Sequence, residues 1–395
     1  MTLHPMSSYP SATHQSSRQL IIYGPLFAGF IVTGVVTTIL GPILPVFIAR
    51  WQLDDAHAGL FFTTQFMGSL SGVGLSSVLL HARGYKSALV PGFLLMAIGI
   101  GGLNAGSLSL ALLATAAFGC GYGLATPGTN LYVAETAGPK RAPALTLLNL
   151  AWGVGAVMCP VLMLAALRYN HFSRILFLIA ANALLLALIL LFVPFVSRAH
   201  YESTVPSGAT HATTIQVPIA LGLLFFLYVG TENGVSGWAA EQAKRVGFGA
   251  RWTLAPMFFW AGLLTGRALA TLLLLRIKEI RLVIGGLLIA AAGTLVLLLA
   301  TTGIGVIFGV TFAGLGLASL YPIFIAWLSK WYGARARRMG GIMFSLAALG
   351  GATLPWTVGF LSKHANSLRI GLLVPLAACF AMIFLVALLR RRIAA

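Results

Sequence analysis

Charged residues are scarce in this 395-residue chain, and acidic residues are the scarcest of them. Asp, Glu, Lys and Arg make up 8% of the sequence, whereas a soluble domain carries about 25%. Only seven residues are acidic, and hydrophobic residues reach 59%. A water-soluble fold of this length cannot bury so much apolar surface, so the composition predicts an integral membrane protein.

Cysteines and catalytic motifs are equally sparse. Cys120, Cys159 and Cys379 lie in apolar segments, which is typical of packing residues rather than of disulfides or metal ligands. The sequence contains no Walker loop, paired-acid motif or Cys–His arrangement, so we expect no enzyme activity, no metal and no cofactor. Although the formal net charge is +18, Lys and Arg lie in short loops between apolar runs, so we expect no nucleic-acid partner.

Long apolar runs occupy most of the chain. A helix needs about 20 apolar residues to cross a hydrocarbon core about 30 Å thick. Twelve runs meet this requirement, at 20–48, 57–80, 87–104, 107–134, 142–167, 173–197, 217–240, 252–275, 282–301, 303–332, 338–362 and 367–390. The predicted fold is therefore an all-α membrane protein with twelve transmembrane helices.

A polar stretch and an internal repeat divide these spans six and six. Residues 198–216 are rich in Ser, Thr, Pro and Gly, which is typical of a linker. The GYGLAT sequence at 121–126 resembles GLGLAS at 314–319, an offset of 193, and the Gly-Ala pairs at 155 and 351 give an offset of 196. Two pseudo-symmetric six-helix bundles are typical of transporters. The predicted parts are a cytoplasmic tail (1–19), two bundles (20–197 and 217–390), a cytoplasmic linker (198–216) and a second tail (391–395).

The distribution of basic residues predicts the orientation. With both termini cytoplasmic, 16 Lys and Arg fall in inner loops and tails and 8 in outer loops, which leaves Arg267 as the one basic residue inside a span. An excess of positive charge on the cytoplasmic side is the normal pattern. We therefore expect a multi-pass protein of the cell inner (plasma) membrane, monomeric and surrounded by lipid.

Several segments resemble the major facilitator superfamily along essentially the whole chain. Residues 41–45 (GPILP), 51–55 (WQLDD) and the degenerate loop 81–86 (HARGYK) are similar to the segments that follow spans 1 and 2 in that family. Segments 130–133, 148–152, 228–234 and 259–267 look most like the fucose-permease-like sugar transporters. The resemblance implies secondary transport by alternating access, most simply of a sugar or related polyol.

Two departures from the family bear on mechanism. Fucose-permease-like proton symporters use carboxylates in spans 1 and 4, where this chain has Gly41 and Thr126. Drug antiporters carry a Gly-rich run ending in Gly-Pro in span 5, of which Cys159-Pro160 keeps only part. Uptake of a sugar with or without protons is the first hypothesis, and efflux of an amphipathic drug-like compound or lipid is the alternative. A membrane enzyme would need a convergent polar cluster, which the sequence does not show.

Glu232 and Arg267 are the predicted coupling residues. Glu232 is the only acid in the middle of a span, and glycines that loosen a helix follow it. A carboxylate surrounded by hydrocarbon binds a proton more readily than one in water, so Glu232 is a candidate proton carrier. Arg267 is predicted to pair with Glu232, to bind substrate or to extend to the membrane interface.

Amides and tryptophans within the spans are the predicted sugar ligands. Amides supply hydrogen bonds and aromatic rings supply a stacking face, although an amide can also join two helices and a Trp can mark the interface. The candidates are Gln65, Asn130, Asn149, Trp152, Asn233, Trp238, Trp260 and Trp356. Asn149 and Trp152 are the best pair, because a spacing of three places both on one helix face.

Four residues at the predicted inner ends of spans are candidate gating residues. Arg83 and Lys86 lie in the loop between spans 2 and 3. Glu135 ends span 4, close in sequence to Arg141, so an ion pair could form there. A solvated loop charge is the alternative interpretation for Glu135.

Overall fold

The computed structural model describes residues 12–195 and 216–393, and this part of the chain is helical without strands. The first half contains α1 (Ala12–Thr38), α2 (Leu40–Trp51), α3 (Asp55–Arg83), α4 (Lys86–Gly102), α5 (Leu108–Thr136), α6 (Arg141–Arg168) and α7 (Phe172–Phe192). The second half contains α8 (Gln216–Arg245), α9 (Ala255–Leu273), α10 (Glu279–Leu299), α11 (Gly303–Leu317), α12 (Leu320–Tyr332), α13 (Ala336–Ala365), α14 (Leu368–Gly371) and α15 (Leu373–Ile393). Short 3-10 turns at Gly138–Lys140, Gly249–Leu254 and Gly333–Arg335 complete the described elements.

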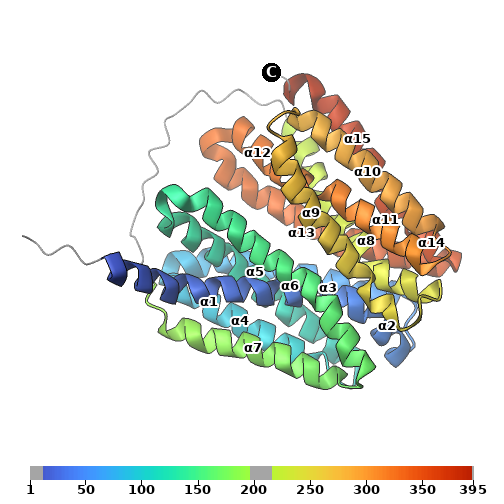
Figure 1. Cartoon of the computed structure of the whole chain (residues 1–395), viewed down its shortest axis with the longest axis horizontal. Coiled ribbons are helices and arrows are strands. Elements are labelled where there is room, and N and C mark those ends of the chain that lie inside the picture. Colours follow the sequence, from blue (N-terminus) through green and yellow to red (C-terminus); the bar gives the residue numbers. More distant parts are fainter. Residues whose placement is uncertain (1–11, 196–215, 394–395) are drawn as a thin grey trace, which may run out of the picture.

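These helices form twelve membrane spans, as the sequence predicts. Within the described residues, ten segments are long and apolar enough to cross a bilayer by length and composition. Helix α4 is apolar but has only 17 residues, and the 29-residue α3 completes the set. The fold class is confirmed as an all-α protein of two six-helix bundles (Figure 1). Helix α1 begins at Ala12, so the predicted tail 1–19 includes its first turns.

Three of the spans consist of two helices each, and a proline follows every break. Proline has no N–H to donate, and its ring collides with the carbonyl four residues earlier. The breaks α1/α2, α11/α12 and α14/α15 precede Pro42, Pro322 and Pro375, and the carbonyls four residues earlier belong to Thr38, Ala318 and Gly371. Each of those three residues lies at or next to the point where the first helix of its span ends.

Close contacts of glycines with the backbone of a neighbouring helix show the pseudo-symmetry of the halves. A Cβ added at Gly155 would collide with the carbonyl oxygen of Ile31, which brings α6 directly against α1. A Cβ at Gly350 would collide in the same way with the carbonyl oxygen of Phe226, between α13 and α8. Both residues of the second pair follow those of the first by 195 positions. The structural repeat therefore lies between the offsets of 193 and 196 predicted from sequence motifs, because small-residue motifs tolerate a shift of one or two residues.

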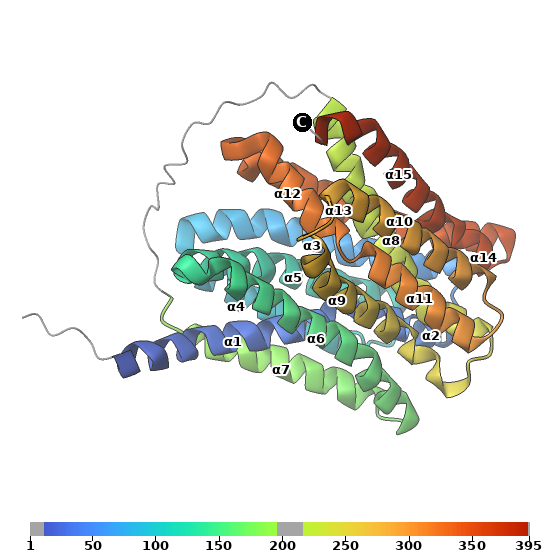
Figure 2. The same cartoon turned by 45° about the horizontal axis from the view of Figure 1, so that its top comes forward.

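The two halves meet at one end of the molecule. Helix α3 packs on α13, α2 on α8 and α6 on α9. In two views, the blue-to-green first half and the yellow-to-red second half approach each other near α2 and α14 (Figures 1 and 2). They diverge toward the end where α7 finishes and α8 begins. We name the diverging end the linker end and the opposite end the far end.

Candidate functional site

Polar and charged side chains fasten the two halves together at the far end. Arg245 on α8 contacts Asp55 on α3, with Nη2 2.5 Å from Oδ1, and its Nε lies 2.7 Å from Oε1 of Glu241. The hydroxyl of Ser362 on α13 donates a hydrogen bond to the other carboxylate oxygen of Asp55. Asp55, Glu241 and Ser362 are buried, whereas Arg245 is exposed. An open cavity of about 250 Å³ at the far end is bordered by Asp55, Arg245 and Ser362 together with Asp54, Lys363 and Asn366. We call Asp55, Glu241, Arg245 and Ser362 the far-end latch.

A second ion pair borders the latch. Lys363 Nζ on α13 lies 3.0 Å from Oδ2 of Asp54, the residue that caps the N-terminus of α3. Although partial burial raises the pKa of Asp54, hydrogen bonds from the backbone N–H of His57, from Lys363 and from the His57 ring lower it to about 2. Asp54 is therefore ionised at physiological pH and holds Lys363 across the boundary between the halves.

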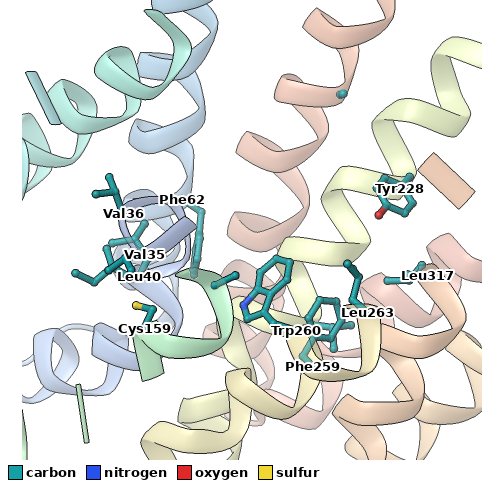
Figure 3. Packing of buried hydrophobic residues seen from close by; sticks show 14 of the residues in the cluster. Val35, Val36, Leu40, Phe62, Cys159, Tyr228, Phe259, Trp260, Leu263 and Leu317 are labelled. Atoms are coloured by element: carbon teal, nitrogen blue, oxygen red, sulfur yellow. The ribbon is translucent and has the colours of Figure 1, made fainter. Parts of the chain in front are cut away.

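Directly beneath the latch, both halves line a small space that we call the central hollow. Its walls are Thr37, Thr38, Leu40, Gly41 and Phe62 from the first half and Asn233, Ser236, Gly237 and Trp260 from the second. Figure 3 shows Trp260 between Phe62 on one side and Phe259 and Leu263 on the other. The break between α1 and α2 lies in this wall, so Pro42, which follows the break, contributes to the shape of the hollow.

Four predicted ligands gather around Thr37 and the central hollow. The amide of Gln65 donates a hydrogen bond to the carbonyl oxygen of Thr37 at 2.9 Å, and the indole of Trp152 donates to its hydroxyl at 3.2 Å. The rings of Trp152 and Trp260 pack edge to face, with centroids 5.4 Å apart, across the boundary between α6 and α9. Asn233 completes the group on the wall of the hollow.

The other predicted ligands lie elsewhere. Trp238 is fully buried and donates to the carbonyl oxygen of Pro355 at 2.9 Å, so it joins α8 to α13. Trp356 packs against Gly59 where α13 meets α3. Asn130 and Asn149 donate to carbonyl oxygens one turn earlier in their own helices, and Asn149 is exposed. Only Trp152 of the predicted Asn149–Trp152 pair therefore reaches the group around Thr37.

Glu232 and Arg267 lie on the linker side of the hollow. The hydroxyl of Tyr228 donates to Oε2 of Glu232 at 2.5 Å. Arg267 on α9 interacts electrostatically with both residues, but it is absent from the ion pairs within 4.0 Å in the described chain. Tyr321 on α12 interacts electrostatically with Glu232 and Arg267, and Tyr122 on α5 with Glu232. We call Tyr228, Glu232 and Arg267 the charged layer.

The candidate gating residues lie at the linker end and bind within the first half. Glu135 accepts a hydrogen bond from the hydroxyl of Tyr85, and Lys86 donates to the carbonyl oxygen of Leu191 at 2.8 Å. Arg83 and Arg141 are exposed. A Glu135–Arg141 ion pair is absent from those of the described chain, because Tyr85 occupies the carboxylate instead.

Sequence reasoning missed Thr37 and the latch. Thr37 gave no signal, since threonine is common in apolar helices and bonds to their backbone. Asp55 precedes the predicted span 57–80, and Glu241 and Arg245 follow the predicted span 217–240, which places all three on the predicted outer side. Their partners cannot be chosen without the packing of α3 and α8 on α13. The sequence contains one signal for the latch: three of the seven acids, Asp54, Asp55 and Glu241, lie on the predicted outer side.

Comparisons with known proteins agree with this architecture. The chain is 23% identical over 379 residues to the glucose/mannose transporter of Bacillus subtilis (strain 168), covering 89% of this chain and 90% of that protein. The E. coli fucose:proton symporter is similar in structure, with a TM-score of 0.62, 19% identity and coverage of 93% and 98%. A bacterial homologue of the human lysosomal transporter Spinster, inward-facing and occupied, gives a TM-score of 0.75 at 18% identity and covers 97% and 98%.

The family assignment rests on the match in sequence. The profile of the Major Facilitator Superfamily matches residues 26–313, well over half of the chain. It spans both bundles and both walls of the central hollow. This chain is thus a multi-pass membrane transporter of the Major Facilitator Superfamily, and not an enzyme.

Proposed function

We propose that the chain carries a sugar or related polyol across the cell inner membrane by alternating access, with the central hollow as the binding site. The observation that carries this proposal is the convergence of Gln65, Trp152, Asn233 and Trp260 on one place between the halves. Transporters of this architecture bind substrate near the bilayer midplane, between their two repeats. The glucose/mannose transporter relative supports the same substrate class.

The chemistry of the hollow suits a polyol. Thr37, Thr38 and Ser236 offer hydroxyls, and Asn233 offers an amide, so hydrogen bonds are available from both walls. Trp260 and Phe62 offer aromatic faces for the C–H surface of a sugar ring. A site with both kinds of contact discriminates strongly, because an analogue without a hydroxyl leaves a buried polar group unpaired.

The closed far end and the diverging linker end support an inward-facing state. The basic residues in the loops support cytoplasmic termini, which makes the linker end cytoplasmic. The latch then seals the outside, and a substrate in the hollow reaches the cytoplasm past the charged layer. In this proposal the bundles 20–197 and 217–390 rock about the hollow as a monomer, joined by the linker 198–216, most of which lies outside the described residues.

Coupling to protons is the second part of the proposal. Glu232 lies next to the hollow, since Asn233 beside it in sequence lines the wall. Its hydrogen bond from Tyr228 fixes the carboxylate in one position, so uptake or loss of a proton there changes the charge beside the substrate. Arg267 supplies the neighbouring positive charge.

Uptake by purified protein in liposomes tests the substrate class. We expect uptake of labelled glucose, mannose or fucose that unlabelled sugar inhibits, and a several-fold higher KM in Trp152→Ala. The control is Trp331→Ala, which removes an indole that packs on Trp327 at the linker end and should leave KM unchanged. Absence of uptake and of binding for all three sugars, with binding of amphipathic cations or lipids instead, would favour the efflux alternative.

A further inference from the structure

We propose that the transported sugar is acidic, and that Arg267 binds its carboxylate. This inference rests on the proposed sugar transport and names the class of sugar. It starts from the position of Arg267 on α9. Trp260 lines the hollow, and Arg267 follows it by seven residues, which is two helical turns or about 10 Å of rise. Arg267 therefore lies on the same face of α9, on the path between the hollow and the linker end.

The side chain between them shows which way this face points. A Cβ added at Gly153 of α6 would meet the side chain of Leu264, so this face of α9 is directed toward the first half. Arg267 comes less than one turn after Leu264. It interacts with Tyr321, which also interacts with Tyr122 of the first half, so Arg267 lies near the boundary between the halves. A ligand between the halves is within its reach.

Arg267 has no carboxylate in contact. Its Nε is buried and has no hydrogen-bond partner. The other acids in the described chain have assigned partners: Asp54 with Lys363, Asp55 and Glu241 with Arg245, Glu135 with Tyr85, and Glu279 with Trp327. Glu202 lies outside the described residues. Glu232 alone remains near Arg267, and it accepts from Tyr228 without an ion pair to the guanidinium.

Arg267 interacts with the hydroxyl of Tyr228, but no carboxylate lies within 4.0 Å of it in the described chain, and its Nε has no partner. A guanidinium without a contacting anion is costly within a membrane span, so a ligand that supplies the anion gains binding energy. A carboxylate matches the fork of N–H donors on arginine better than a hydroxyl does. A ligand that places a carboxylate on Arg267 and sugar hydroxyls in the hollow is a hexuronate or an aldonate.

The charge balance also favours an acid. The empty site holds one positive charge on Arg267 and one negative charge on Glu232. When a proton from water binds a carboxylate oxygen of Glu232 and the anionic sugar binds Arg267, the loaded site again has zero net charge. Both forms then cross between states without an uncompensated charge inside the membrane, whereas a neutral sugar with protonated Glu232 leaves Arg267 unbalanced.

Two matched sugar pairs test the inference on the purified full-length protein. D-Glucuronate is compared with D-glucose, and D-galacturonate with D-galactose, by calorimetric binding and by thermal shift. Acetate serves as an anion without hydroxyls. We expect an acid to bind at least about tenfold more tightly than its neutral partner, and Arg267→Gln to abolish this preference. Arg267→Lys should keep part of it, and Arg276→Gln, the same change at an exposed arginine beyond α9, should keep all of it.

The outcomes separate the two proposals. Preference for a uronate that disappears in Arg267→Gln supports the inference. If neutral sugars bind as well as the acids, or if Arg267→Gln keeps the preference, the acidic-sugar inference is overturned while sugar transport stands. If neither member of any pair binds, both proposals fail. Acetate that binds as tightly as the uronates overturns the sugar component of recognition. Retained binding of glucose by Arg267→Gln would show that the variant is folded.

Discussion

Thr37 is a single residue that joins three helices. Its hydroxyl donates to Thr33 within α1 and accepts from the indole of Trp152 on α6, and its carbonyl accepts from Gln65 on α3. Thr37→Val keeps the shape but leaves the buried indole N–H without its acceptor. Losing a neutral hydrogen bond costs about 1 kcal/mol, so we expect about fivefold weaker sugar binding.

Calorimetry on the purified variant measures this change. Thr357→Val is the matched control, since its hydroxyl bonds only to its own helix at Thr353. Equal affinity in Thr37→Val and wild type would remove Trp152 from the binding site.

In the proposed function, coupling to protons depends on Glu232. In Glu232→Gln the amide oxygen can still accept from Tyr228, but the side chain cannot exchange a proton. We therefore expect loss of uptake driven by a pH gradient, with sugar exchange at equal pH preserved. Counterflow and gradient-driven uptake in liposomes measure the two separately. Accumulation by Glu232→Gln at the wild-type level would exclude the proton role.

The sequence alone predicts individual candidate site residues but not their arrangement. Glu232, Arg267, Trp152 and Trp260 could be selected because polar or aromatic groups inside a span are few and costly to place there. Their grouping could not be derived, since it depends on which helix faces meet across the two halves. Trp238 is also a tryptophan within a span, like the candidate ligands Trp152 and Trp260, but its indole donates to the backbone carbonyl of Pro355. Only the packed structure separates these two roles.

For whole helices, the contacts at Gly155 set how closely α6 approaches α1. In Gly155→Ala the added methyl group meets the carbonyl oxygen of Ile31, so the helices must separate. Overpacking of this kind costs about 1–3 kcal/mol, and we expect a lower thermal midpoint in detergent. Gly74→Ala on α3 meets nothing within 4 Å, so it should be neutral or slightly stabilising. Equal midpoints for both variants would mean that the α1–α6 contact is not tight.

Helix number and length were largely predictable, whereas helix breaks and caps were only partly so. Twelve apolar runs define twelve spans because lipid requires every backbone group to bond within its own helix. The breaks before Pro42, Pro322 and Pro375 were not foreseen, since other prolines, such as Pro160, lie inside unbroken helices. A proline removes a hydrogen bond in every case, and the packing around it decides whether the helix separates or bends.

At the scale of the whole molecule, the proposed alternating access requires the far-end latch to open. Arg245→Gln removes the charge that holds Asp55 and Glu241, and leaves two buried carboxylates without a cation. The two carboxylates are buried but Arg245 is exposed, so solvent screens part of the lost attraction, and we expect the population of the closed far end to fall. Spin labels at Ala49→Cys and Ala365→Cys, in a background without the native cysteines, would report a longer distance across the far end.

The matched control is Arg174→Gln, because Arg174 is exposed and its hydrogen bond, to His171, stays within the first half. An unchanged distance distribution in Arg245→Gln would show that apolar packing alone closes the far end.

The pH dependence of far-end closure follows from Asp54. Its pKa in the folded protein is about 2, below the usual 3.8, so its contribution is fully present above the usual value. That contribution disappears as the pH falls from about 4 toward 2, where the carboxylate takes up a proton and releases Lys363. We expect the Asp54–Lys363 contact to be constant between pH 5 and 8, measured by the same spin labels. A change in that window that disappears in Asp54→Asn would contradict this assignment.

The break between α1 and α2 has a consequence for how the binding site can be mapped. Pro42 has no N–H, so the carbonyl of Thr38 lacks its normal helical donor, and Thr38 belongs to the wall of the hollow. A main-chain oxygen is present whatever side chain the residue carries. Alanine scanning therefore cannot remove this acceptor and will undercount the contacts to a sugar. Replacing Pro42 instead restores the donor, so the position most informative about Thr38 is four residues away from it.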